Sequence, residues 1–467
     1  MRIAIIGGGV AGASSAIYLR NLGADVTLFE KRPFLIGGPP ACHLHAGGNL
    51  YPDIDDLQRK QLLRESIEFL RYYPQAIERR PTVLAVPKHI AIDAAELERR
   101  TQLLAQYYRE LVAKDAANEV LGDPEHYYLV FSKEQLTELR ELPTPQIPQN
   151  HVEWLIAYSK EVDLERLKFP VLLVQEYGIN IFRLSAIAHL RLRGDGVHTS
   201  TRVTNVRKKG EKFFITYEKD GKSRTEAFDF LINAAGFESG TIDDMLGFRR
   251  KRLVEFKAAY VAKWHSRYLY PEMIFHGVRG TEHGMAQFTP YPGGYYQLHG
   301  MRKDITLFED GVAASSEESS QPKLPRKFLD WIERGWPKDA ALHRTQRAIE
   351  YVSRYLPAFK EAQPTATPLF GAQQIPGEDI SLRAAEVSFE GDRYARCEIV
   401  KVSSIFAMLD AITERLVDLG ALAGTSLGKR GYGELCDEEE IDILARTIAA
   451  SRGYPEDMAR LALPYLA

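Results

Sequence analysis

The sequence has little of several features that mark specialised classes of protein. It holds 3 cysteines in 467 residues, Cys42, Cys397 and Cys436, and no Cys-x-x-Cys pair, which excludes a disulfide scaffold and a thiolate zinc site as organising features. It has no excess of one charge, because 60 Lys and Arg residues stand against 63 Asp and Glu residues. A nucleic-acid binder that works by bulk electrostatics is therefore excluded. No apolar run approaches the roughly 20 residues that cross a bilayer, so we expect membrane contact to be peripheral at most.

What is present is the composition of an ordinary globular protein. Hydrophobic residues make up 45% of the chain and charged residues 26%, and at about 150 residues per domain the length predicts two or three domains. The scarcity of cysteine fits a reducing compartment. The apolar run Ile3–Ile6 is too short for the core of a signal peptide. We therefore expect a cytoplasmic protein.

The first thirty residues carry the strongest motif of the chain. A short apolar run at residues 2–6 is typical of a parallel strand that is covered on both faces. Residues 13–22 are typical of a helix that Gly23 ends, and residues 25–29 of a second strand. Between the first strand and the helix lies a segment with the spacing Gly-x-Gly-x-x-Gly, Gly7-Gly8-Gly9-Val10-Ala11-Gly12. This order of strand, glycines, helix and strand predicts a dinucleotide-binding unit.

Each part of this unit has a physical role toward a dinucleotide. Gly7 permits the tight turn, Gly9 lets the backbone approach a pyrophosphate, and Gly12 lets the helix pack closely on the strand. The N–H groups and the dipole at the start of the helix favour an anion. Glu30, which lies 18 residues after Gly12, is expected to bind ribose hydroxyls and to repel a 2′-phosphate. The expected contacts here are Gly7, Gly9, Val10, Ala11, Gly12, Glu30 and Lys31.

Three later segments extend the pattern. A glycine- and proline-rich loop follows Glu30, a buried strand ends in small residues, and a short polar segment precedes an amphipathic helix at 403–419. Their diagnostic residues are His45-Ala46-Gly47-Gly48, Ile232-Asn233-Ala234-Ala235-Gly236 and Lys401-Val402-Ser403-Ser404. Together with the first motif, these segments resemble the FAD-dependent oxidoreductases of the D-amino acid oxidase superfamily. This superfamily includes glycine and sarcosine oxidases, 2-hydroxyglutarate dehydrogenases and more distant malate:quinone relatives.

The resemblance implies an α/β fold of two domains. A discontinuous Rossmann-like FAD-binding domain is expected at residues 1–80, 181–250 and 366–467. An inserted α+β substrate domain with an antiparallel sheet is expected at 81–180 and 251–365. The spacing of apolar residues predicts helices within 53–79 and 92–118 and strands at 82–87, 260–264, 284–289 and 294–299.

The resemblance also implies that FAD is the cofactor and that it is held without a covalent bond. No second Gly-x-Gly-x-x-Gly occurs in the chain, which argues against a separate NAD(P)H domain, so the substrate itself would reduce the flavin. Cys42 stands where the family more often has Ser or Thr, and Cys397 is expected to be a buried free thiol. The further cofactor contacts implied by the family are Cys42, Gly47, Gly48, Val203, Ala235, Gly236, Lys401, Val402 and Ser403.

Lys401 is the first candidate for catalysis. A reduced flavin carries extra negative charge at N1 and the C2 carbonyl, which a cation or a helix N-terminus stabilises. Relatives of the sarcosine oxidase type have a lysine that faces the flavin in this position, and the alternative is a surface lysine beside a helix cap. Ser403 and Ser404 are candidate N-caps of the following helix.

Four further residues are candidates on their chemistry. His43 and His45 point the same way in an extended segment and could act as bases, or serve as structural hydrogen-bonding groups; His45 stands where the family more often has Asn. Arg302 is favoured over Arg183 and Arg383 as the partner of a substrate carboxylate. Tyr295 shares one face of a predicted strand with Gln297 and His299, which is either a face over the flavin or an ordinary core face. No metal ligand cluster is evident by spacing.

These observations lead to one preferred function and three alternatives. We expect an oxidoreductase that oxidises a small carboxylate-bearing amine by hydride transfer to flavin N5. Oxygen, a quinone or another acceptor then reoxidises the flavin. The first alternative is a dehydrogenase for 2-hydroxyacids or malate that passes electrons to a quinone. The others are a flavin monooxygenase, which needs NAD(P)H, and a flavoprotein without catalysis.

Overall fold

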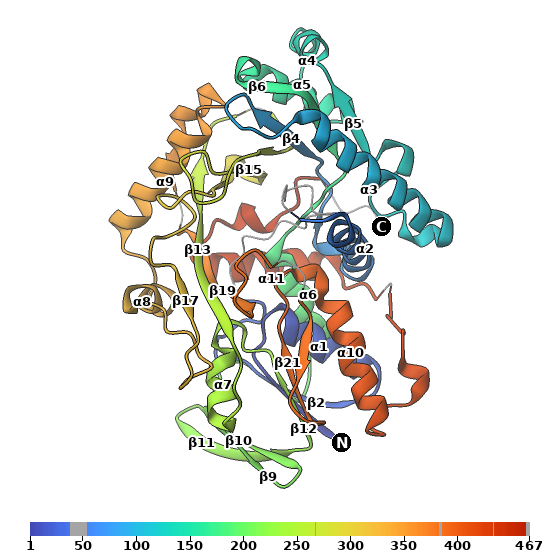
Figure 1. The fold of residues 1–467 in the computed structure, drawn as a ribbon, viewed down its shortest axis with the longest axis vertical. Coiled ribbons are helices and arrows are strands. Elements are labelled where there is room, and N and C mark those ends of the chain that lie inside the picture. The colour runs from blue at the N-terminus through green and yellow to red at the C-terminus, as the bar shows by residue number, and fades with distance from the viewer. Residues whose placement is uncertain (38–53, 267, 366, 383–384, 433, 464–467) are drawn as a thin grey trace.

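The protein is described by a computed structural model that covers residues 1–37, 54–266, 268–365, 367–382, 385–432 and 434–463 (Figure 1). Its helices are α1 (Val10–Asn21), α2 (Asp56–Tyr72), α3 (Ala94–Lys114), α4 (Lys133–Leu139), α5 (His151–Glu161), α6 (Ile181–Arg191), α7 (Ser239–Leu246), α8 (Arg326–Arg334), α9 (Lys338–Val352), α10 (Ile405–Asp418) and α11 (Glu438–Ser451). No helix in these ranges has both the length and the apolar run of a membrane span.

A six-stranded sheet forms the lower part of the molecule in Figure 1. Its central strands pair in parallel, as expected of a dinucleotide-binding unit. Three of them, at residues 2–6, 25–29 and 230–233, coincide with the two strands of the motif and with the strand that ends in small residues. The strand order is β20 (Val387–Phe389), β21 (Tyr394–Cys397), β12 (Phe230–Asn233), β1 (Arg2–Ile6), β2 (Asp25–Phe29) and β8 (Val197–His198). A separate antiparallel sheet of β9 (Arg202–Lys209), β10 (Lys212–Lys219) and β11 (Lys222–Phe228) packs against it.

A larger, mostly antiparallel sheet forms the upper part of the molecule. Its path runs through β17 (Val312–Ala314), β13 (Arg252–Lys263), β16 (Tyr295–Gly300), β15 (Ala286–Tyr291), β14 (Glu272–Phe275), β4 (Thr82–Pro87), β6 (Leu167–Val174) and β5 (Tyr128–Phe131). The strands β18 (Gln363–Pro364) and β19 (Leu369–Pro376) pair with β13, and β3 (Ile77–Glu78) pairs with β7 (Gly178–Ile179) apart from this sheet. The α/β fold with an antiparallel second layer is thus confirmed.

The two faces of the large sheet have different neighbours. On β16, Tyr296 and Leu298 belong to the apolar cluster that α9 covers. On the opposite face, Ala259 and Val261 of β13 join one continuous core with the helices around the six-stranded sheet. We call this second face the inner face. Because side chains alternate along a strand, Tyr295, Gln297 and His299 lie on the inner face.

A buried carboxylate, Asp243 of α7, connects the two sheets. Its oxygens accept hydrogen bonds from Arg396 Nε at 2.8 and 3.0 Å and from the Tyr394 hydroxyl at 2.7 Å, both on β21. Arg252, at the start of β13, donates to the same carboxylate. Asp243 has no exposed surface, so water cannot replace these partners. The six-stranded sheet and the first residue of β13 are therefore held at one point.

The variant Asp243→Asn should lower the free energy of unfolding by about 3–5 kcal/mol, because two guanidinium groups then stay buried beside a neutral amide. The midpoint of urea unfolding, followed by tryptophan fluorescence, measures the loss. Asp392→Asn removes a carboxylate whose side chain is 83% exposed and should change stability by less than about 0.5 kcal/mol. Equal midpoints for the two variants would show that the network does not hold the sheets together.

Candidate functional site

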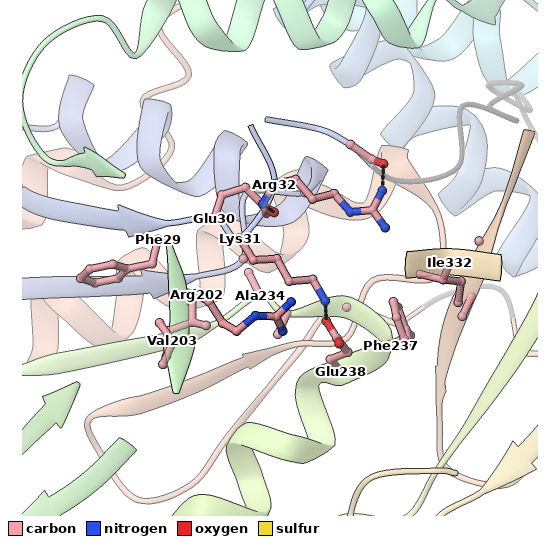
Figure 2. Close-up of a pocket in the computed structure, with 18 of the residues that line it drawn as sticks. Phe29, Glu30, Lys31, Arg32, Arg202, Val203, Ala234, Phe237, Glu238 and Ile332 are labelled. Carbon is pink, nitrogen blue, oxygen red and sulfur yellow. Dashed lines mark hydrogen bonds and ion pairs between the residues drawn. The ribbon is translucent and has the colours of Figure 1, made fainter. Parts of the chain in front are cut away.

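A cavity of about 600 Å³ lies at the carboxyl ends of the central strands of the six-stranded sheet (Figure 2). This edge of an open parallel sheet is where ligands bind. The walls come from the turn after β1, the ends of β2 and β12, the start of β9 and the middle of β19. The predicted cofactor contacts that line it are Gly7, Gly9, Glu30, Lys31, Val203, Ala235 and Gly236.

The three glycines of the motif meet different surroundings. A Cβ on Gly7, whose φ is +101°, would lie 2.3 Å from the carbonyl oxygen of Ala234, and a Cβ on Gly12 would lie 1.8 Å from that of Gly7. These two glycines therefore allow β1, α1 and β12 to pack closely. A Cβ on Gly9 would meet no atom within 4 Å, so the backbone there is open to the cavity. The residues present thus fit a cofactor whose phosphates approach the chain at Gly9.

The start of α1 favours an anion at the same place. Gly9 is the N-cap of α1, so no side chain satisfies the N–H groups of the first turn, which Val10 and Ala11 begin. No acidic residue lies in this turn. These N–H groups and the helix dipole together attract negative charge.

Glu30 stands at the end of β2, as the motif predicts. Its carboxylate accepts hydrogen bonds from the backbone N–H of Gly8 and of Arg32, each at 2.7 Å. These contacts fix the carboxylate at the cavity wall and leave further lone pairs on both oxygens. Lys31 pairs with Glu238 across the cavity, as Figure 2 shows.

Gly37 lines the cavity and is the last described residue before residues 38–53. The guanidinium groups of Arg32 and Arg452 both donate to the Gly37 carbonyl, at 3.3 and 3.2 Å. Five predicted site residues lie in the loop that follows and fall outside the described residues. Their roles stay predictions: Cys42, His43, His45, Gly47 and Gly48.

The segment around Lys401 forms the expected helix start, with one difference. Lys401 precedes a short 3-10 turn, Val402–Ser404, that leads into α10. Ser404 occupies the N-cap position but does not cap the helix with its side chain. Its hydroxyl instead donates to Glu65 of α2 at 2.7 Å, and burial raises the pKa of that carboxyl. The predicted N-cap position is therefore confirmed at Ser404, but its hydroxyl does not cap the helix, since a buried acceptor on another helix binds it.

The structure does not bring Arg302 and Tyr295 together at one site. Arg302 makes two hydrogen bonds of 2.8 Å to Asp304 and lies over the ring of Tyr351, which belongs to the cluster covered by α9. Tyr295 lies on the inner face, and its hydroxyl is 3.5 Å from Lys263 Nζ. Arg302 thus already has a carboxylate partner.

Two further groups named for their chemistry are buried in the structure, and a third, Arg383, lies outside the described residues. Arg183, another candidate for a substrate carboxylate, is buried and pairs with Glu438. Cys397 is a buried free thiol, as predicted.

The sequence analysis missed a charged cluster on the inner face. Glu255 and Lys257 lie on β13, and their charged atoms are 2.8 Å apart. Arg279, from the loop after β14, also pairs with Glu255. Burial alone would raise the pKa of Glu255, but the charges of Lys257 and Arg279 hold that pKa below its usual value. The available signal was a pair of charged residues at i and i+2 within an otherwise apolar strand.

The family follows from the comparison with known proteins. The model of the FAD dependent oxidoreductase family (DAO) matches residues 2–374. The chain belongs to this family. Its cofactor is FAD, and the resemblance to the D-amino acid oxidase superfamily is confirmed. Among curated protein sequences, none matches the chain significantly.

Solved structures share the fold at low sequence identity. A glycine oxidase from Geobacillus kaustophilus has 14% identity and a TM-score of 0.53, with 92% of this chain and 99% of that chain covered. An L-proline dehydrogenase from P. horikoshii has 13% identity and a TM-score of 0.54, with 91% and 94% covered. An L-amino acid deaminase from Proteus vulgaris has 12% identity and a TM-score of 0.57, with 94% and 96% covered. At these identities, the likeness shows the fold alone.

The variant Gly9→Ala should fold but bind FAD about tenfold or more weakly. The added methyl enters open space, so stability is kept, but it separates a charged phosphate from the backbone N–H groups, and such hydrogen bonds contribute ~1.5–3 kcal/mol. Titration of the apoprotein with FAD, followed by flavin fluorescence, measures the change. Gly424→Ala, also with no atom within 4 Å of the new Cβ, is the control. FAD affinity equal to that of the parent protein would contradict a phosphate site at Gly9.

Proposed function

We propose that this FAD-dependent oxidoreductase oxidises a small carboxylate-bearing amine, such as an amino acid or an N-substituted amino acid, by hydride transfer to flavin N5. The observation that carries the proposal is the inner face of the large sheet. Lys257, His299 and Met301 are partly exposed there, although they lie on or beside interior strands. Partly exposed polar and cationic groups on an otherwise packed face suit a small charged substrate, whereas an ordinary packing face would be closed and apolar.

The names of proteins with this fold bear on the choice between an amine and an alcohol. Several proteins with this fold are named for amino acids, among them the glycine oxidase and the L-amino acid deaminase. Another, from Bacillus halodurans, is named a glycerol-3-phosphate dehydrogenase, so an alcohol beside an anionic group is the second candidate. A 2-hydroxyacid dehydrogenase has this chemistry.

The cofactor and the chain have separate tasks in this proposal. FAD, held without a covalent bond, supplies the hydride acceptor. Lys401 and the N-terminus of the following helix would stabilise the negative charge that a reduced flavin carries. Tyr295 would orient the substrate, and His43 or His45 would take its proton. Arg302 has no part here, because Asp304 already occupies its guanidinium group.

We infer two further properties from the same reasoning. The electron acceptor is oxygen, a quinone or another oxidant, since the described residues hold one glycine-rich dinucleotide motif only. A cytoplasmic location fits the low cysteine content.

Anaerobic mixing of the purified yellow protein with amino acids, N-methyl amines and 2-hydroxyacids tests the substrate class. The proposal expects rapid loss of the visible flavin band with an amine that carries a carboxylate. Bleaching by 2-hydroxyacids alone would replace the amine by an alcohol. Bleaching only by NADPH would indicate a monooxygenase, and no bleaching by any small reductant would indicate a flavoprotein without catalysis.

The variant Lys401→Met should slow flavin reduction or reoxidation about a hundredfold, because one cation beside the developing charge is lost, while FAD stays bound. Stopped-flow absorbance with the substrate found above, and then with oxygen, measures the two steps separately. Lys429→Met removes an exposed lysine beyond α10 and should leave both rates unchanged. Unchanged rates in Lys401→Met itself would remove Lys401 from the site.

A further inference from the structure

The charged cluster on β13 does not have the arrangement of an ordinary surface ion pair. The Glu255 side chain is 4% exposed, whereas those of Lys257 and Arg279 are 26% and 30% exposed. A buried carboxylate therefore holds two cations that both remain accessible. With two positive charges around one negative charge, the cluster keeps a net positive charge toward its accessible side.

The cluster is connected to the segment that precedes Lys401. Lys257 Nζ donates to Gln373 Oε1 at 2.8 Å, and Gln373 Nε2 donates to the Val400 carbonyl at 2.9 Å. Gln373 lies opposite Glu255 in the register of β13 and β19, and Gly371, opposite Lys257, lines the cofactor cavity. These contacts place Lys257 beside the chain segment and the cavity wall that the proposed function uses, and Glu255 links Arg279 to it.

The guanidinium group of Arg279 retains an unused donor. One of its terminal nitrogens binds Glu255, while its Nε is buried and has no hydrogen-bond partner among the described residues. Buried donors without a partner are rare and costly. Because this Nε is enclosed by protein, an anion would contact Arg279 through the accessible part of its side chain, which is 30% exposed and carries the guanidinium charge.

We propose that Lys257 and Arg279 form the binding site for the anionic group of the substrate, with Glu255 as the positioning residue that holds both cations. This proposal rests on the proposed function, of which it names the anion-binding residues. It assigns to Arg279 the task that the sequence analysis gave to Arg302. Glu255 lowers the affinity for anions by its charge while it fixes the geometry.

Binding of acetate to the holoprotein tests this proposal without turnover. Acetate stands for the substrate carboxylate, and its binding is followed by the change in flavin absorbance. Lys257→Met and Arg279→Met should each weaken acetate binding about tenfold or more, because each removes a charge-assisted hydrogen bond. Lys251→Met, which removes a lysine with a 77% exposed side chain next to the same strand, should leave it unchanged.

Glu255→Gln gives a result that a purely structural cluster would not give. The amide keeps the size of the side chain but removes its negative charge, so acetate should bind more tightly than in the parent protein. FAD content and melting temperature, measured on each variant, show that the fold is kept. Weaker or equal acetate binding in a folded Glu255→Gln protein would overturn the proposal, as would unchanged binding in the two methionine variants or no acetate binding to the parent protein.

The outcome separates this proposal from the proposed function. If no amine bleaches the flavin but acetate binding still depends on Lys257 and Arg279, then the anion site stands and the amine substrate is wrong. If a carboxylate-bearing amine bleaches the flavin with the same KM in the parent protein and in both variants, then the proposed function stands and the anion site is wrong.

Discussion

The close packing of β1, α1 and β12 around Gly7 and Gly12 is the constraint on which the rest of the structure depends. A side chain at either position would collide with backbone atoms, as the distances of 2.3 and 1.8 Å from a Cβ show. Because the two glycines remove this obstacle, the start of α1 stands at the carboxyl edge of the sheet. The cofactor cavity lies there, and the inner face of the large sheet packs toward the same layer.

The six-stranded sheet and the large antiparallel sheet contribute different parts of the proposed site. The dinucleotide unit supplies most of the predicted cofactor contacts that line the cavity. Strands β13 and β16 carry the groups that we propose bind the substrate on the inner face, and Asp243 holds β13 to the six-stranded sheet through Arg252. The cofactor site and the substrate face thus come from segments far apart in the sequence. Their relation depends on a few buried polar contacts that cross between the sheets.

Local patterns predicted several of the elements. The first strand, the second strand and β4 have the bounds that the apolar runs indicated, and α2, α3 and α10 lie within or close to the predicted helices. These predictions succeeded because short-range periodicity and glycine positions decide such elements. The division of the chain into two discontinuous domains stays a prediction, because it rests on the resemblance rather than on a boundary signal.

Side-chain partners were harder to predict, because they depend on contacts between distant segments. Ser404 has the sequence of an N-cap, yet Glu65 binds its hydroxyl from 339 residues away. Arg302 was favoured for a substrate, although Asp304, two residues further on, accepts hydrogen bonds from its Nε and from one terminal nitrogen. The cluster of Lys257 and Arg279 forms only when β13, β19 and the loop after β14 come together. No local sequence pattern predicts how β19 and the loop after β14 align with β13.

The amount and identity of the flavin in the purified protein test the account most directly. The flavin released by heat denaturation of a known amount of purified protein can be identified by chromatography and counted by absorbance. The account predicts a yellow protein that releases intact FAD in a ratio near one per chain, with no flavin left attached to the polypeptide. A folded protein that is colourless and does not take up added FAD would contradict it.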